Sequence, residues 1–113
     1  MGVRFNWTVG YESEKNFALQ PWGFLISIDS IEQTLTEYEL EHAFPPTESA
    51  RSLLPELLSH QINSDTGISY DLFKVKKWYF GQEDYSVKLY SEEAYIMFKL
   101  VYGGQSATDN EPQ

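Results

Sequence analysis

The chain of 113 residues has a mass of 13.1 kDa, which is the size of a single domain. Its composition, 42% hydrophobic and 16% aromatic, excludes a chain that is disordered throughout, and no apolar run approaches the roughly 18 residues that cross a bilayer. The absence of cysteine excludes disulfides, thiol catalysis and thiolate-bound metals. The net charge of −9 argues against a general nucleic-acid-binding protein.

The first part of the chain predicts strands. Residues 3–11 alternate between large apolar side chains and small or polar ones, and this period of two is typical of a strand with one solvent-facing side. Residues 12–21 are expected to form a connection, and 22–29 a second strand that pairs as a hairpin with a third over 33–41. Threonine and tyrosine favour a strand over 33–41. The competing interpretation is a helix, because four residues recur at helical spacing: Ile31, Leu35, Tyr38 and His42.

The centre of the chain predicts a helix that follows the stop at Pro45-Pro46. Apolar residues recur at helical spacing over 50–62. With Ser52 as the N-cap, Pro55 falls in the first turn, where its missing N–H costs little. A kinked helix that begins near Thr47 is the alternative.

The last third predicts a long strand over 68–80 with a bulge near Lys76-Lys77, a turn over 81–84 and a strand over 85–89. A final helix is predicted over 92–102.

The ends of this final helix have their own signals. Ser91 is the expected N-cap, Glu92 and Glu93 suit the positive end of the helix dipole, and Gly103 is expected to end the helix with a positive φ. A final strand is the alternative, because β-forming residues fill 95–102.

The element order β-β-β-α-β-β-α predicts an α+β fold, an antiparallel sheet of about five strands with two helices packed on one face. We expect residues 1–103 to form one domain. Residues 104–113 have no large apolar side chain and predict a disordered tail. The first residues lack the layout of a secretory signal, so a cytoplasmic protein is expected.

Acidic residues gather in the middle of the chain. Residues 29–71 hold nine acidic residues and one basic residue, which gives −8, whereas residues 1–28 are neutral and residues 72–113 carry −1. Such a segment is either a solubilising surface or an electrostatic footprint for a basic partner.

A row of carboxylates follows from the strand predicted over 33–41. Glu37, Glu39 and Glu41 would share one face at intervals of about 6.6–6.8 Å, with Leu35 on the same face. A regular row of carboxylates imitates a phosphate backbone, which lysine and arginine bind. We therefore predict that these three glutamates contact a basic surface of a partner protein. Two neighbouring acids complete the predicted acidic site, Asp29 and Glu32.

No motif for catalysis or phosphate binding is present in the sequence. The two histidines, His42 and His60, lie on different predicted elements. A metal site of His42 with Glu39 and Glu41 is disfavoured, because Glu41 would face away from His42 on a strand. The sequence therefore predicts no enzymatic activity, no metal and no cofactor.

The chain also has three Trp, eight Tyr and seven Phe, more tyrosine than a core can bury with its hydroxyls paired. Tyrosine and tryptophan anchor protein interfaces, and we predict that Trp78, Tyr79 and Tyr90 belong to the partner-binding surface. Three lysines within residues 74–77 come just before Trp78 and Tyr79 in the sequence. Single-strand nucleic-acid-binding proteins use such pairing, but the net charge favours an edge strand protected by lysines.

The segment Tyr85–Tyr90 that runs into Ser91–Gly103 resembles the strand-to-helix ending of small uncharacterised phage proteins. The resemblance covers residues 85–103 alone. It implies an acidic, cysteine-free phage protein that inhibits a host nucleic-acid enzyme, of the anti-CRISPR or DNA-mimic type, and that acts in the host cytoplasm. It assigns no catalytic residue.

The sequence thus predicts a non-enzymatic acidic protein that occupies a basic surface on a nucleic-acid-binding partner protein, without direct contact to nucleic acid or membrane. An immunity or antitoxin protein is one alternative. A structural component of a larger particle, in which aromatic patches pair subunits, is another. The sequence makes no prediction of the oligomeric state.

Overall fold

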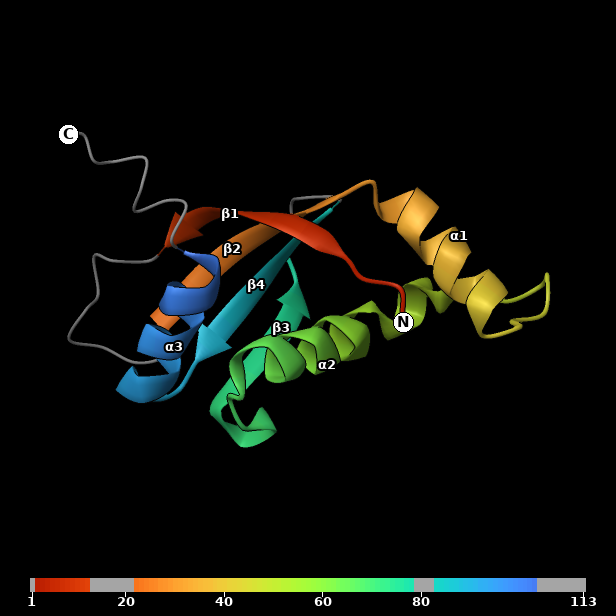
Figure 1. The fold of residues 1–113 in the computed structure, drawn as a ribbon. Helices are drawn as coiled ribbons and strands as arrows, with labels where there is room; N and C mark the ends of the chain where they lie inside the picture. The colour runs from red at the N-terminus through yellow and green to blue at the C-terminus, as the bar shows by residue number, and fades with distance from the viewer. Residues whose placement is uncertain (1, 13–21, 79–82, 104–113) are drawn as a thin grey trace.

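The computed structural model describes residues 2–12, 22–78 and 83–103 (Figure 1). Its described strands are β1 (Asn6–Glu12), β2 (Trp22–Asp29), β3 (Phe73–Lys77) and β4 (Asp84–Leu89). Its described α-helices are α1 (Ile31–Glu41), α2 (Leu54–Thr66) and α3 (Glu92–Tyr102), and short 3-10 helices cover Ala50–Leu53 and Tyr70–Leu72. The class is α+β, as predicted. Within the described ranges there are four strands and three α-helices, in place of about five and two.

The four strands form one antiparallel sheet in the order β1-β2-β4-β3. β2 and β4 are the central pair, and Ile26 lies opposite Tyr85. A register shift occurs on β1 between Val9 and Tyr11. β3 pairs with β4 without interruption up to Lys77, so the bulge predicted near Lys76-Lys77 is wrong.

One face of the sheet packs against α2 and α3, which lie on the same side of it (Figure 1). Alternate residues of three strands are buried there: Phe24, Ile26, Ile28, Phe73, Val75, Tyr85, Val87 and Leu89. α2 adds Leu58 and Ile62, one helical turn apart, and α3 adds Phe98, whose ring stacks on Phe24 with centroids 4.6 Å apart. Burial of these side chains provides the main driving force for folding.

The strand predicted over 33–41 is wrong, because these residues belong to α1. Ile31, Thr34 and Leu35 are buried at the spacing that places them on one helical face. The Thr34 hydroxyl donates to the carbonyl oxygen of Ser30 at 3.0 Å, so the helix accommodates this β-branched residue with its polar group paired. Packing of the apolar face thus overrides the β-propensity of threonine and tyrosine.

α2 begins at Leu54, and the N-cap predicted at Ser52 is wrong. Ser49 instead caps the preceding 3-10 helix by accepting a hydrogen bond from the Arg51 N–H at 3.1 Å. Pro55 lies in the first turn of α2, as predicted. The helix ends at Thr66 and is capped by Gly67, whose φ of 78° is in the left-handed region that favours glycine.

α3 confirms the predicted N-cap, because the Ser91 hydroxyl oxygen accepts a hydrogen bond from the Ala94 N–H at 3.0 Å. The positive φ predicted for Gly103 is wrong, since its φ is −89°. A Cβ atom there would lie 2.9 Å from the Cγ atom of Lys99, so close packing accounts for the glycine.

Several predictions fall partly or wholly outside the described residues. The predicted tail over 104–113 lies outside them, as do residues 79–80 of the long predicted strand and 81–82 of the predicted turn. The described part of that strand is shorter than predicted, because β3 begins at Phe73. Within the described ranges, no helix has both the length and the apolar character required to cross a membrane.

Candidate functional site: an acidic helix surface beside a polar cleft

The exposed side of α1 carries Glu37, Leu40 and Glu41, which together are the α1 acidic surface. The two glutamates are one helical turn apart, so their carboxylates lie on the same side of the helix. Leu40 lies next to Glu41 and is 77% exposed. Neither glutamate forms an ion pair with another described residue. This surface therefore presents two negative charges that no described residue compensates, together with one apolar side chain.

Glu39 does not belong to this surface, so the predicted row of three carboxylates on one face is wrong. Residues two apart on a helix are rotated by about 200° from one another, and Glu39 therefore points away from Glu37. Its carboxylate oxygen Oε2 accepts a hydrogen bond from the Ala50 N–H at 2.6 Å. This hydrogen bond from Glu39 links α1 to the 3-10 helix that precedes α2. Leu35, predicted to share the face of the row, is buried in the core.

The remaining predicted acids border α1. Asp29 is exposed at the end of β2, just before α1 begins. Glu32 lies in the first turn of α1, where its charge suits the helix dipole, and it forms an ion pair with Arg51. Because Arg51 compensates its charge, Glu32 adds less to the negative potential of this end of the molecule than Glu37 or Glu41 does.

The predicted aromatic residues lie apart from one another. Trp78 is 40% exposed and its N–H donates to the Asp84 carbonyl oxygen at 2.9 Å. Tyr90 is 41% exposed and its N–H donates to the Leu72 carbonyl oxygen at 2.8 Å. These two bonds lie at opposite ends of the pairing between β3 and β4, so Trp78 and Tyr90 do not form one aromatic patch. Tyr79 lies outside the described residues.

A cleft of about 470 Å³ lies between residues 2–5, the end of α1 and one side of α2. Tyr38 and His42 line it from the α1 side, and each follows a glutamate of the α1 acidic surface in the sequence. Arg4 and Asp65 also line it. Its size falls within the range of small-molecule sites, about 300–1,000 Å³.

Both histidines line this cleft, although eighteen residues separate them in the sequence. The His42 Nδ1 atom is 3.0 Å from the Tyr38 carbonyl oxygen, which can only accept, so Nδ1 carries a proton and donates this hydrogen bond. The His60 Nδ1 atom is 2.7 Å from the Tyr70 hydroxyl. One sequence pattern indicated that Tyr38 and His42 lie together: the helix considered as the alternative for this segment placed both on the same face.

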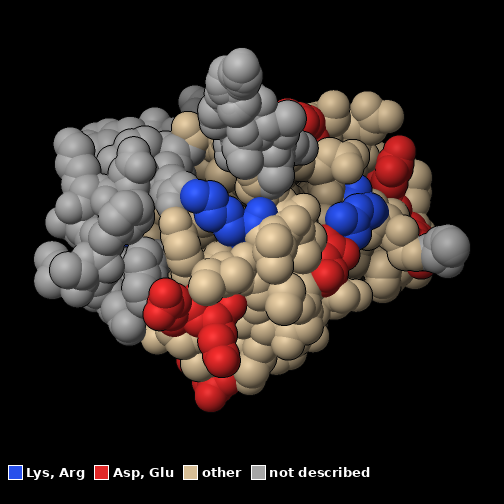
Figure 2. Space-filling view, turned by 60° about the vertical axis from the view of Figure 1, so that its left-hand side comes forward, with Lys and Arg blue, Asp and Glu red and all other residues tan. Residues whose placement is uncertain are grey.

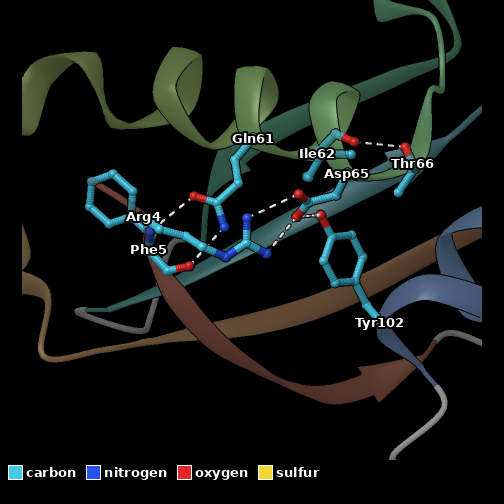
Figure 3. A network of polar contacts seen from close by, with 7 residues as sticks. All are labelled: Arg4, Phe5, Gln61, Ile62, Asp65, Thr66 and Tyr102. Atoms are coloured by element: carbon cyan, nitrogen blue, oxygen red, sulfur yellow. Dashed lines mark hydrogen bonds and ion pairs between the residues drawn. The ribbon is translucent and has the colours of Figure 1, made fainter. Parts of the chain in front are cut away.

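One wall of the cleft is held by a polar network (Figure 3). The Arg4 guanidinium donates two hydrogen bonds to the Asp65 carboxylate, at 3.0 and 2.8 Å, and the Tyr102 hydroxyl donates a third at 2.5 Å. One turn earlier on α2, the Gln61 side chain accepts from the Phe5 N–H at 2.9 Å and donates to the Phe5 carbonyl oxygen at 2.7 Å. α2 thereby holds the N-terminal segment directly, and Tyr102 of α3 joins the network through Asp65 of α2.

The network shifts the ionisation of its members. The hydrogen bonds from Arg4 hold the pKa of Asp65 below its ordinary value, against the opposing effect of partial burial. Burial raises the pKa of the Tyr102 hydroxyl, and its hydrogen bond to Asp65 raises it further. At neutral pH the site therefore has an ionised carboxylate and a protonated phenol. Sequence reasoning missed this network because 61 residues separate Arg4 from Asp65.

In the described part of the chain, no three His, Cys, Asp or Glu side chains are placed to hold a metal ion. Comparisons of the chain with protein-family models, with curated proteins and with solved structures found no match. The fold and the site thus define a small α+β protein that has an exposed acidic helix beside a polar cleft. The resemblance of residues 85–103 to phage proteins, and the absence of enzymatic activity, stay predictions.

Proposed function

We propose that this protein is a non-enzymatic binding protein whose α1 acidic surface occupies a basic surface on a partner protein. The observation that carries the proposal is the exposure of Glu37 and Glu41 on one side of α1 without a compensating charge among the described residues. Like charges at this spacing weaken a helix slightly. Their proximity is therefore better explained by binding than by the stability of α1.

The chemistry of the surface favours a protein partner. The two carboxylates suit lysine or arginine side chains, and the exposed Leu40 supplies an apolar contact that a phosphate mimic alone would lack. Asp29 adds charge at the other end of the helix. A nucleic-acid-binding protein presents such a basic surface. The proposed function is that of an inhibitor of the type found in phages, acting in the cytoplasm of the host cell. An immunity or antitoxin protein would use the same surface.

The experiment compares Glu37→Gln/Glu41→Gln with wild type as immobilised bait. The control is Glu92→Gln/Glu93→Gln, which removes two exposed charges from the first turn of α3 at the other end of the molecule (Figure 1). We expect a basic protein to be retained by wild type and by the control and to be lost with the α1 variant. Association should slow as salt rises, because salt screens exposed charges. Equal retention by wild type and the α1 variant would contradict the proposal.

A second candidate, a component of a larger assembly, is favoured by α3. Its outer side exposes Ile96, Met97, Leu100 and Val101, with Leu100 71% exposed. Figure 2 brings the α3 side of the molecule forward and shows broad uncharged surface between separate acidic and basic groups. Exposed apolar side chains that neighbour one another on a helix, as these four do, are typical of contacts between proteins. Sedimentation of wild type and Leu100→Glu tests this candidate, which predicts that an oligomer of wild type dissociates in the variant.

A further inference from the structure

We propose that the sheet face opposite α2 and α3 binds single-stranded nucleic acid, through a basic and aromatic strip on β3 and β4. The strip consists of Lys74, Lys76, Lys88, Trp78 and Tyr90. It is separate from the α1 acidic surface, so this inference does not rest on the proposed function.

The pairing of β3 with β4 places the three lysines together. The Tyr90 N–H bonds to Leu72 at one end of the ladder and the Trp78 N–H to Asp84 at the other. Hydrogen-bonded pairs recur at every second residue between these ends, so Lys74 and its partner Lys88 form such a pair, with Cα atoms about 5.5 Å apart. Lys76 follows Lys74 on the same face, about 7 Å farther along β3.

These lysines are exposed, whereas the residues that alternate with them are buried. Phe73, Val75, Val87 and Leu89 point toward the helices, and Lys74, Lys76 and Lys88 therefore point away from them. None of the three lysines forms an ion pair with another described residue. Gly23, which lies opposite Lys88 on β2, has no side chain to cover it.

The edge position of β3 accounts for lysine on this strand, but it does not account for Lys88 directly opposite Lys74 on β4. Like charges directly opposite one another on antiparallel strands destabilise the pair. The strip concentrates three positive charges on one face of a chain whose net charge is −9. The neighbouring acid on this face, Asp84, accepts a hydrogen bond from the Ser27 hydroxyl at 2.5 Å. A ligand with several negative charges would remove the repulsion between the lysines.

The aromatic side chains identify the ligand class. Trp78 and Tyr90 occupy positions of the same alternation as the lysines, at opposite ends of the ladder, and both are substantially exposed. Tyr90 lies opposite Leu72, which is six residues before Trp78 along the chain. The two aromatic positions are therefore about 20 Å apart along the sheet. Proteins that bind single strands combine lysines that track the phosphates with aromatic rings on which bases stack. An acidic polypeptide has the charge but offers few planar groups to two separated aromatic rings.

The net charge had predicted no direct contact with nucleic acid. The structure shows why the net charge is a poor guide for this face. Residues 29–71 carry a net charge of −8, and most of these acidic residues lie on α1, α2 and the segments beside them. The strip lies instead on β3, β4 and the residue after each of these strands. Charges on separate surfaces are screened from one another beyond about 8 Å at physiological salt.

The experiment titrates the full chain with a fluorescently labelled ten-nucleotide oligothymidylate and records anisotropy between 20 and 200 mM salt. Each phosphate neutralised on a single strand contributes about −0.7 to the slope of log K against log salt, so three lysines predict a slope of about −2. Affinity should then fall about 100-fold over this tenfold range of salt.

Matched variants assign the contact to the strip. Lys76→Gln should reduce the slope by about 0.7, whereas Lys77→Gln removes the same charge from the next residue and should leave it unchanged, since Lys77 lies over the Tyr85 ring toward the other face. Trp78→Ala should weaken binding at least about fivefold without changing the slope, and Trp78→Phe should restore most of it.

Three results would overturn the inference. The first is the absence of binding at 20 mM salt, and the second is an equal loss in Lys76→Gln and Lys77→Gln. The third is displacement of the oligonucleotide by polyglutamate at equal charge concentration, which would indicate an acidic polypeptide as the ligand. Circular dichroism of each variant distinguishes a lost contact from a lost fold. The test is independent of the α1 variants, so failure of one proposal does not decide the other.

Discussion

Asp65→Asn tests whether the contacts among Arg4, Asp65 and Tyr102 stabilise the fold. The Asp65 side chain is 17% exposed and accepts three hydrogen bonds, two from Arg4 and one from Tyr102. Asparagine keeps the shape of the side chain and one acceptor oxygen, but loses the charge. The substitution therefore isolates the electrostatic part of the network.

The expected loss is about 1–2 kcal/mol of unfolding free energy. Arg4 is 57% exposed, so its ion pair is discounted to the range of surface pairs, about 0.2–1 kcal/mol. The hydrogen bond from the half-buried Tyr102 hydroxyl to a charged acceptor contributes about 1 kcal/mol more, because it is less exposed to water.

Urea unfolding at neutral pH measures this loss, and an m-value of about 1–2 kcal/mol/M predicts that the midpoint falls by roughly 1 M. The pH dependence gives a second check. The pKa of Asp65 is lowered in the folded state, so its stabilisation is complete above its unfolded value of about 3.9 and is lost as the pH falls through the folded value. The difference between wild type and variant should therefore shrink in acid.

Arg4→Gln serves as the control, because combining it with Asp65→Asn should cost less than the sum of the two single changes. Two results would refute the reasoning: an unchanged midpoint at neutral pH, or a difference that stays constant into acid.

Two further substitutions test the local structure. Ser91→Ala should lower the unfolding free energy by about 0.5–2 kcal/mol because it removes the cap of α3, while Ser52→Ala, at the exposed position wrongly predicted as a cap, should leave the urea midpoint unchanged. Gln61→Ala should cost about 1–3 kcal/mol, because it leaves both backbone groups of the buried Phe5 without their partner, and hydrogen exchange should show faster exchange of the Phe5 amide. Slow exchange of that amide in the variant would contradict the second expectation.

The sequence predicts those parts of the fold whose signals are local. Alternation identified β2 and β4, and the sequence from Ser91 to Tyr102 gave the cap and the extent of α3. α1 was misassigned because its threonines and tyrosine favour strands in isolation, whereas its three buried residues fit the core only as a helix.

The candidate site was less accessible to sequence reasoning. The exposure of Leu40 and the inward turn of Glu39 both follow from the helical phase of α1, so the wrong element type misplaced them. The cleft joins residues 2–5 with α1 and α2, and no local pattern links segments about 35 to 60 residues apart. The strip on β3 and β4 could be anticipated in part, since its lysines and Trp78 are close in sequence.

The strand order also bears on the route by which the chain folds. β3 and β4 are joined by a short connection, whereas every pair between the central strands β2 and β4 joins residues at least 57 apart, the separation of Ser27 and Asp84. Each doubling of a closed loop adds about 0.6 kcal/mol of entropic cost, so the two hairpins should form early and their docking through β2 and β4 should limit the rate. α1 and α2 lie within that long loop. Their contacts with the hairpins therefore belong to the same late, cooperative step that completes the sheet.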